Sequence, residues 1–356
     1  MKHILFILPE YYEIPIGGYK VVFEYSNRLI MDGYKVTIVY PYFLMFWKSS
    51  VKRKLKMCFY FLYYQFFKRK STGFWFPLNK RVKNVFVFTL SEKFIPQADS
   101  YIATAMETAI YLNQYKKIKP ENKHYLIQAV EDWQWGKNAA FDTWKLPLKK
   151  IVVSDWLKTL AEGIGENPTV IENGVDRPGF SCIIPIQERN NLTIMMLYHK
   201  QKLKGCEDGI EALRIVRKKY PDLHPIFFGA PSKPPHLPHW IEYHSMPSEK
   251  DLNHLYNQAS IFLGTSHSEG FGLTVGEAML CGCSVVCTDA GGYLTMAKHQ
   301  ETALVCKVGD SQGLAKNIEL LIENTQLRYD LAENANKFIQ RFTWEAAYKK
   351  FKLLFS

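Results

Sequence analysis

Two glutamates around a glycine-bearing loop are the residues of this chain whose types and spacing best favour chemistry. Glu269 directly precedes Gly270-Phe271-Gly272, and seven residues separate it from Glu277, which lies in a segment with helical spacing. Glycines at a helix entrance leave backbone N–H groups unpaired beside the positive end of the helix dipole, which makes an anion site. Carboxylates would repel the anion, so we expect both to bind hydroxyl groups that flank it.

Two predicted strands position this loop. The apolar run IFLGTS at 261–266 and the run CSVVCTD at 283–289 predict buried strands, with a helix starting near residue 273 or 274. An alternative is purely structural. Thr274 and Glu277 also fit a capping box, and glycine loops are ordinary where a strand leads into a helix. The spacing of the two glutamates is what favours a ligand site.

That spacing, with GFG after the first glutamate and EAM at the second, resembles the E-x7-E signature of retaining glycosyltransferases of family 4. The resemblance implies an α/β fold of the GT-B class, with two Rossmann-like doubly wound parallel-sheet domains facing a cleft. It also implies that Glu269 contacts the sugar of a nucleotide-diphosphate donor and that Glu277 holds its ribose. The donor diphosphate would be held by the backbone of Gly270, Phe271, Gly272, Leu273 and Thr274.

Other donor-binding residues follow from the same resemblance. Lys204, followed by Gly205, fits a lysine that stabilises the departing diphosphate, whereas His199 stands where the family has an arginine. The backbone near Met246 is expected to hold the base. Gly17 and Gly18, at the entrance of the first predicted helix, are expected near the donor phosphate and the acceptor.

Glu131 and Asp132 follow a predicted strand, at a place where many family members carry a histidine. A subset that includes rhamnosyltransferases of bacterial surface polysaccharides looks similar here. The two carboxylates are candidate catalytic residues beside Glu269 and Lys204; capping of the next loop is the alternative. No residue stands out as a covalent nucleophile, so we expect same-face attack in which the departing phosphate helps to take the acceptor proton.

The net charge of +11 is concentrated in one stretch. Residues 33–91 contain no Asp or Glu and 12 of the 45 basic residues, which leaves 33 basic against 34 acidic residues elsewhere. Within it, basic clusters flank the aromatic run MCFYFLYYQFF, which is too short to span a bilayer. This composition favours an anionic membrane surface, with an ordinary core helix and a nucleic-acid patch as alternatives. The candidate membrane-binding residues are Lys52, Arg53, Lys54, Lys56, Lys68, Arg69 and Lys70.

The seven cysteines form no C-x-x-C pair, and Cys281, Cys283 and Cys287 lack partners at zinc spacing. We expect them to be small buried side chains. The chain has no D-x-D motif, so the resemblance implies a metal-independent reaction and no cofactor beyond the nucleotide-sugar donor substrate. The first residues predict a strand and not a leader, which with the cysteine usage favours the cytoplasm, peripherally at the inner face of the cell membrane.

The length and two alternating strand–helix series predict two domains. We place an N-terminal acceptor domain at 1–176, with the basic aromatic insert at 45–83, and a nucleotide-sugar domain at 177–341. A linker is expected at 177–191 and a helix at 342–356 that returns to the first domain. The predicted function is transfer of a hexose or rhamnose to a glycan or polyprenyl-linked acceptor in surface polysaccharide biosynthesis, with no nucleic-acid partner. A nucleotide-sugar epimerase of the same fold and a non-catalytic sugar- or membrane-binding scaffold are the alternatives.

Overall fold

The computed structural model describes residues 1–44, 59, 75–132, 136–176, 179–230 and 232–355. These residues form two compact units. Unit 1 comprises Met1–Val153, Lys158–Ile171 and Tyr348–Ser356, and unit 2 comprises Ser154–Leu157 and Glu172–Ala347. The domain bounds given above, 1–176, 177–341 and 342–356, stay a prediction beside this division.

In unit 1, seven described strands form a parallel sheet in the order β3-β2-β1-β4-β5-β6-β7. The strands are β1 (His3–Ile7), β2 (Lys35–Phe43), β3 (Lys83–Thr89), β4 (Ser100–Ala103), β5 (Lys123–Ile127), β6 (Lys149–Val152) and β7 (Thr169–Val170). The helices include α1 (Gly17–Met31), α3 (Met106–Gln114), α4 (Lys137–Trp144) and α5 (Asp155–Glu162). Every residue of β1 is buried, as expected for a parallel strand with both faces covered.

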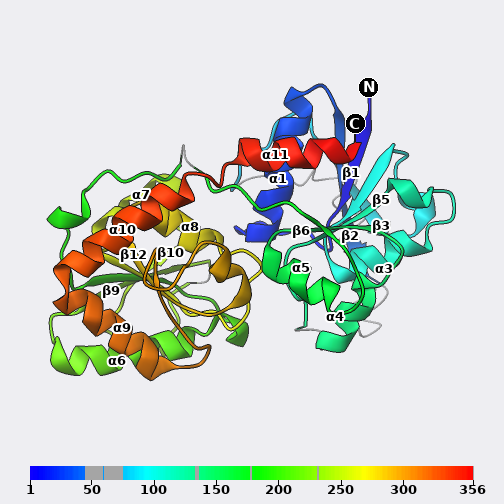
Figure 1. The fold of residues 1–356 in the computed structure, drawn as a ribbon. Helices are drawn as coiled ribbons and strands as arrows, with labels where there is room; N and C mark the ends of the chain where they lie inside the picture. The colour runs from blue at the N-terminus through cyan, green and yellow to red at the C-terminus, as the bar shows by residue number, and fades with distance from the viewer. Residues whose placement is uncertain (45–58, 60–74, 133–135, 177–178, 231, 356) are drawn as a thin grey trace. The chain divides into compact units, whose positions relative to one another are not determined.

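In unit 2, six described strands form a second parallel sheet in the order β10-β9-β8-β11-β12-β13. The strands are β8 (Thr193–Leu197), β9 (His224–Gly229), β10 (Glu242–Ser245), β11 (Ile261–Gly264), β12 (Ser284–Thr288) and β13 (Leu304–Cys306). The helices are α6 (Cys206–Lys219), α7 (Glu249–Gln258), α8 (Leu273–Leu280), α9 (Ser311–Glu323) and α10 (Thr325–Ile339). Figure 1 shows α6 and α9 on one face of this sheet and α7, α8 and α10 on the other.

Both sheets have the strand order of a doubly wound Rossmann-like fold, so the predicted fold class is confirmed for each unit. In this topology the strand order reverses at a switch point, and ligands bind outside the carboxyl ends of the strands there. The switch point lies between β1 and β4 in unit 1 and between β8 and β11 in unit 2. The loops that follow these four strands are therefore the places to look for function.

The last helix, α11 (Trp344–Lys352), brings the end of the chain into unit 1. The ring of Phe351 stacks on Tyr25 of α1 with 4.0 Å between ring centroids, and both side chains are fully buried. Lys352 Nζ and the Tyr348 hydroxyl both donate to Asp32 Oδ2, at 2.6 and 2.8 Å. Figure 1 shows α11 beside α1. An aromatic stack and a shared carboxylate thus hold residues 348–355 in unit 1.

The described part of the predicted linker, residues 179–191, is packed onto unit 2 and is not a free connection. Arg189 is only 8% exposed and donates to the backbone carbonyls of Ile184, Tyr256 and Ala259 at 2.9 to 3.1 Å. Further contacts of the guanidinium reach Cys281 O. The linker prediction is wrong for these residues, because a polar composition does not reveal that an arginine side chain binds buried carbonyls.

Candidate functional site

Three loops meet at the carboxyl edge of the sheet in unit 2, around its switch point. The loop after β8 carries His199 and Lys204, the loop after β11 carries Glu269 and leads into α8, and the loop after β12 carries Gly292. Parallel strands end at the same edge, so residues more than 60 positions apart in the sequence are brought together. Most sequence-predicted donor residues of this unit lie in these loops. The exceptions are Met246, which follows β10, and Leu273, Thr274 and Glu277, which lie within α8.

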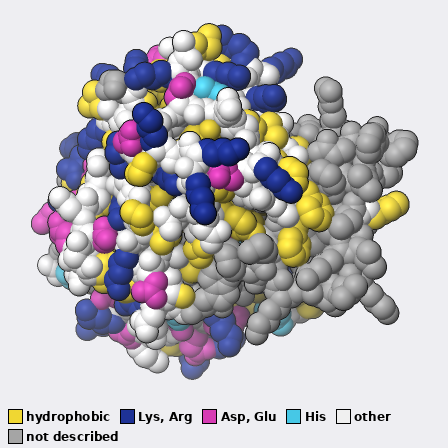
Figure 2. Space-filling view, turned by 90° about the vertical axis from the view of Figure 1, so that its right-hand side faces the viewer, with side chains coloured by type: hydrophobic (Ala, Val, Ile, Leu, Met, Phe, Trp, Pro, Cys, Tyr) yellow, Lys and Arg dark blue, Asp and Glu magenta, His cyan; other side chains and the backbone are white. Residues whose placement is uncertain are grey.

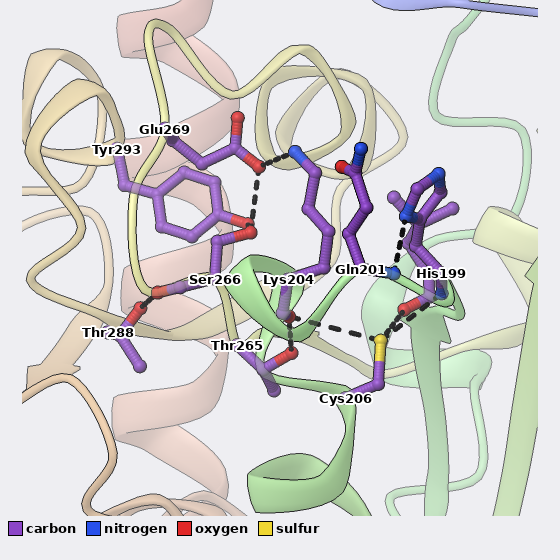
Figure 3. A network of polar contacts seen from close by, with 10 residues as sticks. His199, Gln201, Lys204, Cys206, Thr265, Ser266, Glu269, Thr288 and Tyr293 are labelled. Atoms are coloured by element: carbon purple, nitrogen blue, oxygen red, sulfur yellow. Dashed lines mark hydrogen bonds and ion pairs between the residues drawn. The ribbon is translucent and has the colours of Figure 1, made fainter. Parts of the chain in front are cut away.

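Lys204 and Glu269 form an ion pair at this edge, with 2.5 Å between Nζ and Oε1. Their side chains are 26% and 15% exposed, so the pair is partly shielded from water but accessible. The hydroxyl of Ser266 donates to the same Oε1 at 2.7 Å. Figure 3 shows Lys204 and Glu269 reaching toward each other from different loops. Two of the four residues predicted to be catalytic are therefore in contact.

Tyr293 fixes the direction of the hydrogen bond that Ser266 donates to Glu269. Its hydroxyl donates to Ser266 Oγ at 3.1 Å, and its side chain is only 3% exposed. Burial, and next the charge of Glu269, raise the pKa of Tyr293 well above its usual range, so the phenol keeps its proton. Since Tyr293 donates to Ser266, the single hydroxyl proton of Ser266 is directed to Glu269. Neither Ser266 nor Tyr293 was predicted from the sequence.

The loop that carries Lys204 is bonded directly to the loop that carries Glu269. Thr265 Oγ1 donates to the carbonyl of Lys204 at 2.8 Å, and the amide of His267 donates to the carbonyl of Leu203 at 2.7 Å. Gly205 makes this approach possible, because its φ is +59° and an added Cβ would lie 2.0 Å from Thr265 O. Lys204 and Glu269 are thus positioned by backbone contacts and not only by their own charges.

His199 has a different electrostatic character from the arginine that it replaces. The amide of Gln201 donates to His199 Nδ1 at 3.1 Å, so Nδ1 carries no proton and Nε2 is the donor. Burial and then the charge of Lys204 lower the pKa of His199 below its usual range, while Glu269 opposes this shift. The imidazole is therefore neutral at pH 7. His199 can thus supply one N–H hydrogen bond to the diphosphate, whereas the arginine of the family would supply a charge.

The predicted diphosphate cradle, 270–274, forms the entrance of α8. The helix begins at Leu273, with Gly272 as its N-cap and no capping side chain among the described residues. The predicted alternative of a Thr274–Glu277 capping box is therefore wrong. Gly272 has a φ of +93°, and a Cβ there would lie 2.4 Å from the Tyr293 ring, so only glycine fits. Its neighbour Gly270 is buried as well, whereas Leu273 and Thr274 are half-buried.

Two predicted donor residues near this entrance point into the protein. The ring of Phe271 is 3% exposed and packs against Phe342 at 5.8 Å, so only the backbone of Phe271 is placed to contact a ligand. Glu277 lies in the second turn of α8, not in the first, and is 6% exposed. The Tyr256 hydroxyl donates to Glu277 Oε2 at 3.3 Å. Glu277 therefore has a protein partner.

Met246 follows β10 at the same edge and has an unusual backbone conformation. Its φ is +47°, in the left-handed region that non-glycine residues seldom adopt, and its side chain is 44% exposed. The amide of Met246 donates to the carbonyl of Gly229, the last residue of β9, at 2.8 Å. Residues with such a strained backbone conformation are common at functional sites, where the surrounding structure stabilises them.

The predicted residues of unit 1 lie at the edge of the other sheet. Gly17 and Gly18 are the first residues of α1, and Gln128 Nε2 donates to the carbonyl of Gly18 at 3.1 Å. Glu131 is half-buried and accepts a hydrogen bond from the amide of Met106, at the start of α3. Asp132 is half-buried in a turn. The Gly18 contact joins the segments that follow β1 and β5, and the Glu131 contact joins the segments that follow β5 and β4.

The carboxyl group of Glu131 is protonated at neutral pH. Burial raises its pKa to about 8, the neighbouring Glu107 adds to the rise, and the Met106 amide opposes it. A neutral acid can donate a hydrogen bond to a ligand oxygen, which a carboxylate cannot. The sequence could not predict this state, because it depends on burial and on Glu107, which lies in the first turn of α3.

The seven predicted membrane-binding residues lie outside the described residues: Lys52, Arg53, Lys54, Lys56, Lys68, Arg69 and Lys70. On the face of the described residues in Figure 2, Lys and Arg side chains lie interspersed with Asp and Glu. In the part of the chain that the structure describes, no helix is both long and apolar enough to cross a membrane. Within the same part, no three His, Cys, Asp or Glu side chains gather in a way that could hold a metal ion. Cys281, Cys283 and Cys287 are fully buried, as expected.

The sequence of the chain matches known proteins. Residues 184–338 match the family described as "Glycosyl transferases group 1". A D-inositol 3-phosphate glycosyltransferase of Jonesia denitrificans is 26% identical over 216 residues, which are 53% of this chain and 51% of that protein. The chain thus spans about half the length of this relative. An N,N'-diacetylbacillosaminyl-diphospho-undecaprenol alpha-1,3-N-acetylgalactosaminyltransferase of Campylobacter jejuni is 33% identical over 92 residues, 26% of this chain and 24% of that protein.

The fold of the whole chain also has solved counterparts. HepE of Anabaena, solved in complex with UDP and glucose, has a TM-score of 0.74 and 17% identity, over 100% of this chain and 99% of that chain. This likeness concerns the fold. The predicted GT-B fold class and the resemblance to glycosyltransferases are therefore confirmed, and residues 184–338 are similar in sequence to group 1 glycosyl transferases.

Proposed function

We propose that this protein is a retaining glycosyltransferase of family 4 that moves a hexose or rhamnose from a nucleotide-diphosphate donor. The proposed acceptor is a glycan or a polyprenyl-linked glycan in surface polysaccharide biosynthesis. The group 1 domain supports sugar transfer in general. The donor, the stereochemical course and the pathway are the parts that we add.

The observation that carries the proposal is the Lys204–Glu269 pair beside the uncapped start of α8. A nucleotide sugar presents a diphosphate next to sugar hydroxyls, and this edge presents a cation and a helix N-terminus next to a carboxylate. Lys204 and the first amides of α8 would bind the diphosphate. Glu269 would accept hydrogen bonds from the sugar. Glu277 would reach the ribose only if the Tyr256 hydrogen bond were shared or exchanged.

In the proposed reaction, the bond between the anomeric carbon and the diphosphate oxygen breaks first, and the leaving group takes the bonding electron pair. Lys204 and the α8 amides stabilise the developing negative charge, and His199 adds one N–H hydrogen bond. The acceptor hydroxyl then bonds to the same face of the anomeric carbon. Its proton passes to a diphosphate oxygen. Lys204 thereby supplies charge that a metal ion would otherwise provide, so we propose a metal-independent reaction.

The acceptor part of the proposal rests on the basic aromatic insert and on the relatives. The Campylobacter relative is named for an undecaprenol-linked acceptor, and an anionic membrane surface would bring such an acceptor to residues 45–83. Unit 1 would bind the acceptor, with Glu131 as a neutral hydrogen-bond donor. We accordingly propose a peripheral protein at the cytoplasmic face of the cell membrane.

A nucleotide-sugar panel screened by thermal shift, followed by a transfer assay, tests the proposal. Lys204→Ala and Glu269→Gln are each expected to lower the transfer rate about 100- to 1,000-fold, because each removes charge from the transition-state site. Both variants should remain folded, since the pair is partly exposed. Lys307→Ala is the matched control: Lys307 pairs with Asp289 after β12, is 86% exposed, and should change the rate less than about twofold.

Other outcomes would replace the proposal. Unchanged transfer in either variant would refute the assignment of Lys204 and Glu269. Epimerised donor without any acceptor would identify an epimerase. Saturable donor binding without turnover across a broad acceptor panel would favour a binding scaffold. A product whose anomeric configuration is inverted would exclude the retaining course.

A further inference from the structure

Glu269 is paired with Lys204, the cation that the diphosphate is proposed to bind. In the structure the Lys204 ammonium is bonded to Glu269 Oε1, and these two side chains have no other ion-pair partner among the described residues. We propose that Glu269 competes with the diphosphate for Lys204, and that this competition lets the site discriminate the nucleotide sugar from the free nucleoside diphosphate. This inference rests on the proposed function and adds a specificity-determining role for Glu269.

The competition follows from charge. An ammonium has three donors and could touch both anions, but a carboxylate and a diphosphate on one lysine would then lie close together in a partly shielded site. Like charges repel more strongly there than in bulk water. Either Glu269 turns away from Lys204 or the diphosphate binds weakly. A ligand that gives Glu269 a new partner avoids this loss.

The nucleotide sugar provides that partner and the free diphosphate does not. When Glu269 leaves Lys204, sugar hydroxyls can donate to its carboxylate, and charge-assisted hydrogen bonds of this kind are strong. A nucleoside diphosphate without the sugar leaves the carboxylate facing a negative ligand. The same side chain therefore favours the donor before transfer and weakens the hold on the diphosphate product after it.

Ser266 and Tyr293 make the exchange possible without releasing Glu269. Ser266 donates to the same Oε1 that Lys204 contacts, at 2.7 Å, so the carboxylate keeps one donor when the lysine turns to the diphosphate. Tyr293 holds Ser266 in this role by donating to its Oγ. Figure 3 shows the hydroxyls of Tyr293 and Ser266 next to each other, with Ser266 and Lys204 both bonded to the same oxygen of Glu269. Ser266 and Tyr293 are thus positioning residues for the exchange.

The test is a double-mutant cycle on ligand binding, measured by calorimetry with the full chain. Wild type, Glu269→Gln, Lys204→Ala and the double variant are each titrated with inorganic pyrophosphate, UDP and UDP-glucose. We expect Glu269→Gln to bind pyrophosphate and UDP about fivefold more tightly, because the competitor for Lys204 is gone. The ratio of the affinity for UDP-glucose to the affinity for UDP should be about tenfold lower in this variant than in wild type. The reason is that the sugar loses a charged hydrogen-bond acceptor. In the Lys204→Ala background, Glu269→Gln should bring no gain.

Two controls separate the competition from other effects. Glu333→Gln removes the same charge from an exposed pair on α10 and should leave all three affinities unchanged. Glu269→Ala removes the competitor without adding an amide and should show the same gain for pyrophosphate. The pyrophosphate titration does not depend on which base or sugar the protein prefers.

Equal or weaker pyrophosphate binding in both Glu269 variants overturns the competition. A gain that persists without Lys204 overturns it as well, because it would come from general electrostatics. If the wild type transfers sugar while neither variant gains affinity, the proposed function stands and this inference fails. If pyrophosphate and UDP bind none of the proteins, the diphosphate site fails and the proposed function fails with it.

Discussion

The two units have the same strand order and the same switch point, but the loops there carry different chemistry. In unit 2 the loops after β8 and β11 bring a lysine and a glutamate together as an ion pair. In unit 1 the loop after β1 carries Glu10 and Tyr12, whose hydroxyl donates to Glu10 Oε2 at 3.0 Å, and the loop after β4 donates a backbone amide to Glu131. Burial, followed by Glu10, raises the pKa of Tyr12 to about 12.

The topology of each sheet thus determines which loops meet at the switch point. The side chains of those loops determine which kind of ligand can bind there. The edge of unit 2 presents a charged lysine and an uncapped helix start, which suit an anion. The edge of unit 1 presents a phenol that keeps its proton and a carboxyl group that is protonated at pH 7. Such groups suit the hydroxyls of an uncharged sugar better than a diphosphate. The predictions below test this contrast.

The largest effect is expected from Gly272→Ala at the entrance of α8. The added Cβ would lie 2.4 Å from the Tyr293 ring, and the φ of +93° disfavours any side chain. We expect a loss of about 2–4 kcal/mol in the free energy of unfolding, together with loss of pyrophosphate binding. Chemical denaturation followed by circular dichroism measures the first effect and calorimetry the second.

The matched variant in unit 1 is Gly18→Ala. Gly18 has no positive φ, and its added Cβ would lie 3.2 Å from the end of the flexible Gln128 side chain. Alanine also favours a helix, so the free energy of unfolding should change by less than about 1 kcal/mol. Equal losses in the two variants would contradict the view that the entrance of α8 requires glycine and the entrance of α1 does not.

An intermediate effect, visible in its pH dependence, is expected from Glu131→Gln. The pKa of Glu131 is about 8 in the folded protein, above its ordinary value of 4.5 in the unfolded chain. Between these values the folded state binds more protons, so the contribution of Glu131 to stability is complete below pH 4.5 and is lost as the pH rises through 8. Glutamine lacks this titration. Its melting temperature should therefore rise relative to wild type by about 2–5 °C between pH 5 and pH 9.

Differential scanning calorimetry at several pH values checks this result. Asp132→Asn is the control, since it removes a neighbouring charge in the same loop. Melting curves of wild type and Glu131→Gln that shift in parallel with pH would mean that Glu131 is ionised in the folded protein. The proposed contrast between a charged and a neutral edge would then fail.

The smallest effect is expected from His199→Arg, which places a permanent cation where the structure has a neutral imidazole. Pyrophosphate should bind about two- to fivefold more tightly, and the gain should shrink as salt is added. His254→Arg is the control, because His254 lies exposed on α7. An unchanged affinity would mean that the side chain at position 199 does not face the diphosphate.

The sequence predicted the fold class and two strands of unit 2, because buried parallel strands appear as continuous apolar runs. IFLGTS and CSVVCTD became β11 and β12, and the E-x7-E spacing located the entrance of α8. The pairing of Lys204 with Glu269 was beyond sequence reasoning. It depends on two loops that the sheet brings together across 65 positions.

The residues that the sequence did not reveal share one property. Their roles depend on contacts with residues that are distant in the sequence. Ser266 and Tyr293 are unremarkable polar residues until Glu269 is placed beside them. The position of Ser266, at the end of the run IFLGTS, was the available signal. Arg189 was assigned to a linker because nothing in its neighbours indicates buried carbonyl partners. The charge states of His199 and Glu131 depend on burial, which composition does not report.

The placement of Phe351 on Tyr25 has a consequence for how the protein is made. During synthesis, the first 171 residues leave the ribosome well before residues 348–355, which complete the core of unit 1. Until residues 348–355 are made, Tyr25 of α1 lacks the aromatic ring that covers it in the folded protein. We expect fragments that stop short of residue 348 to leave Tyr25 without this cover and to aggregate when expressed alone.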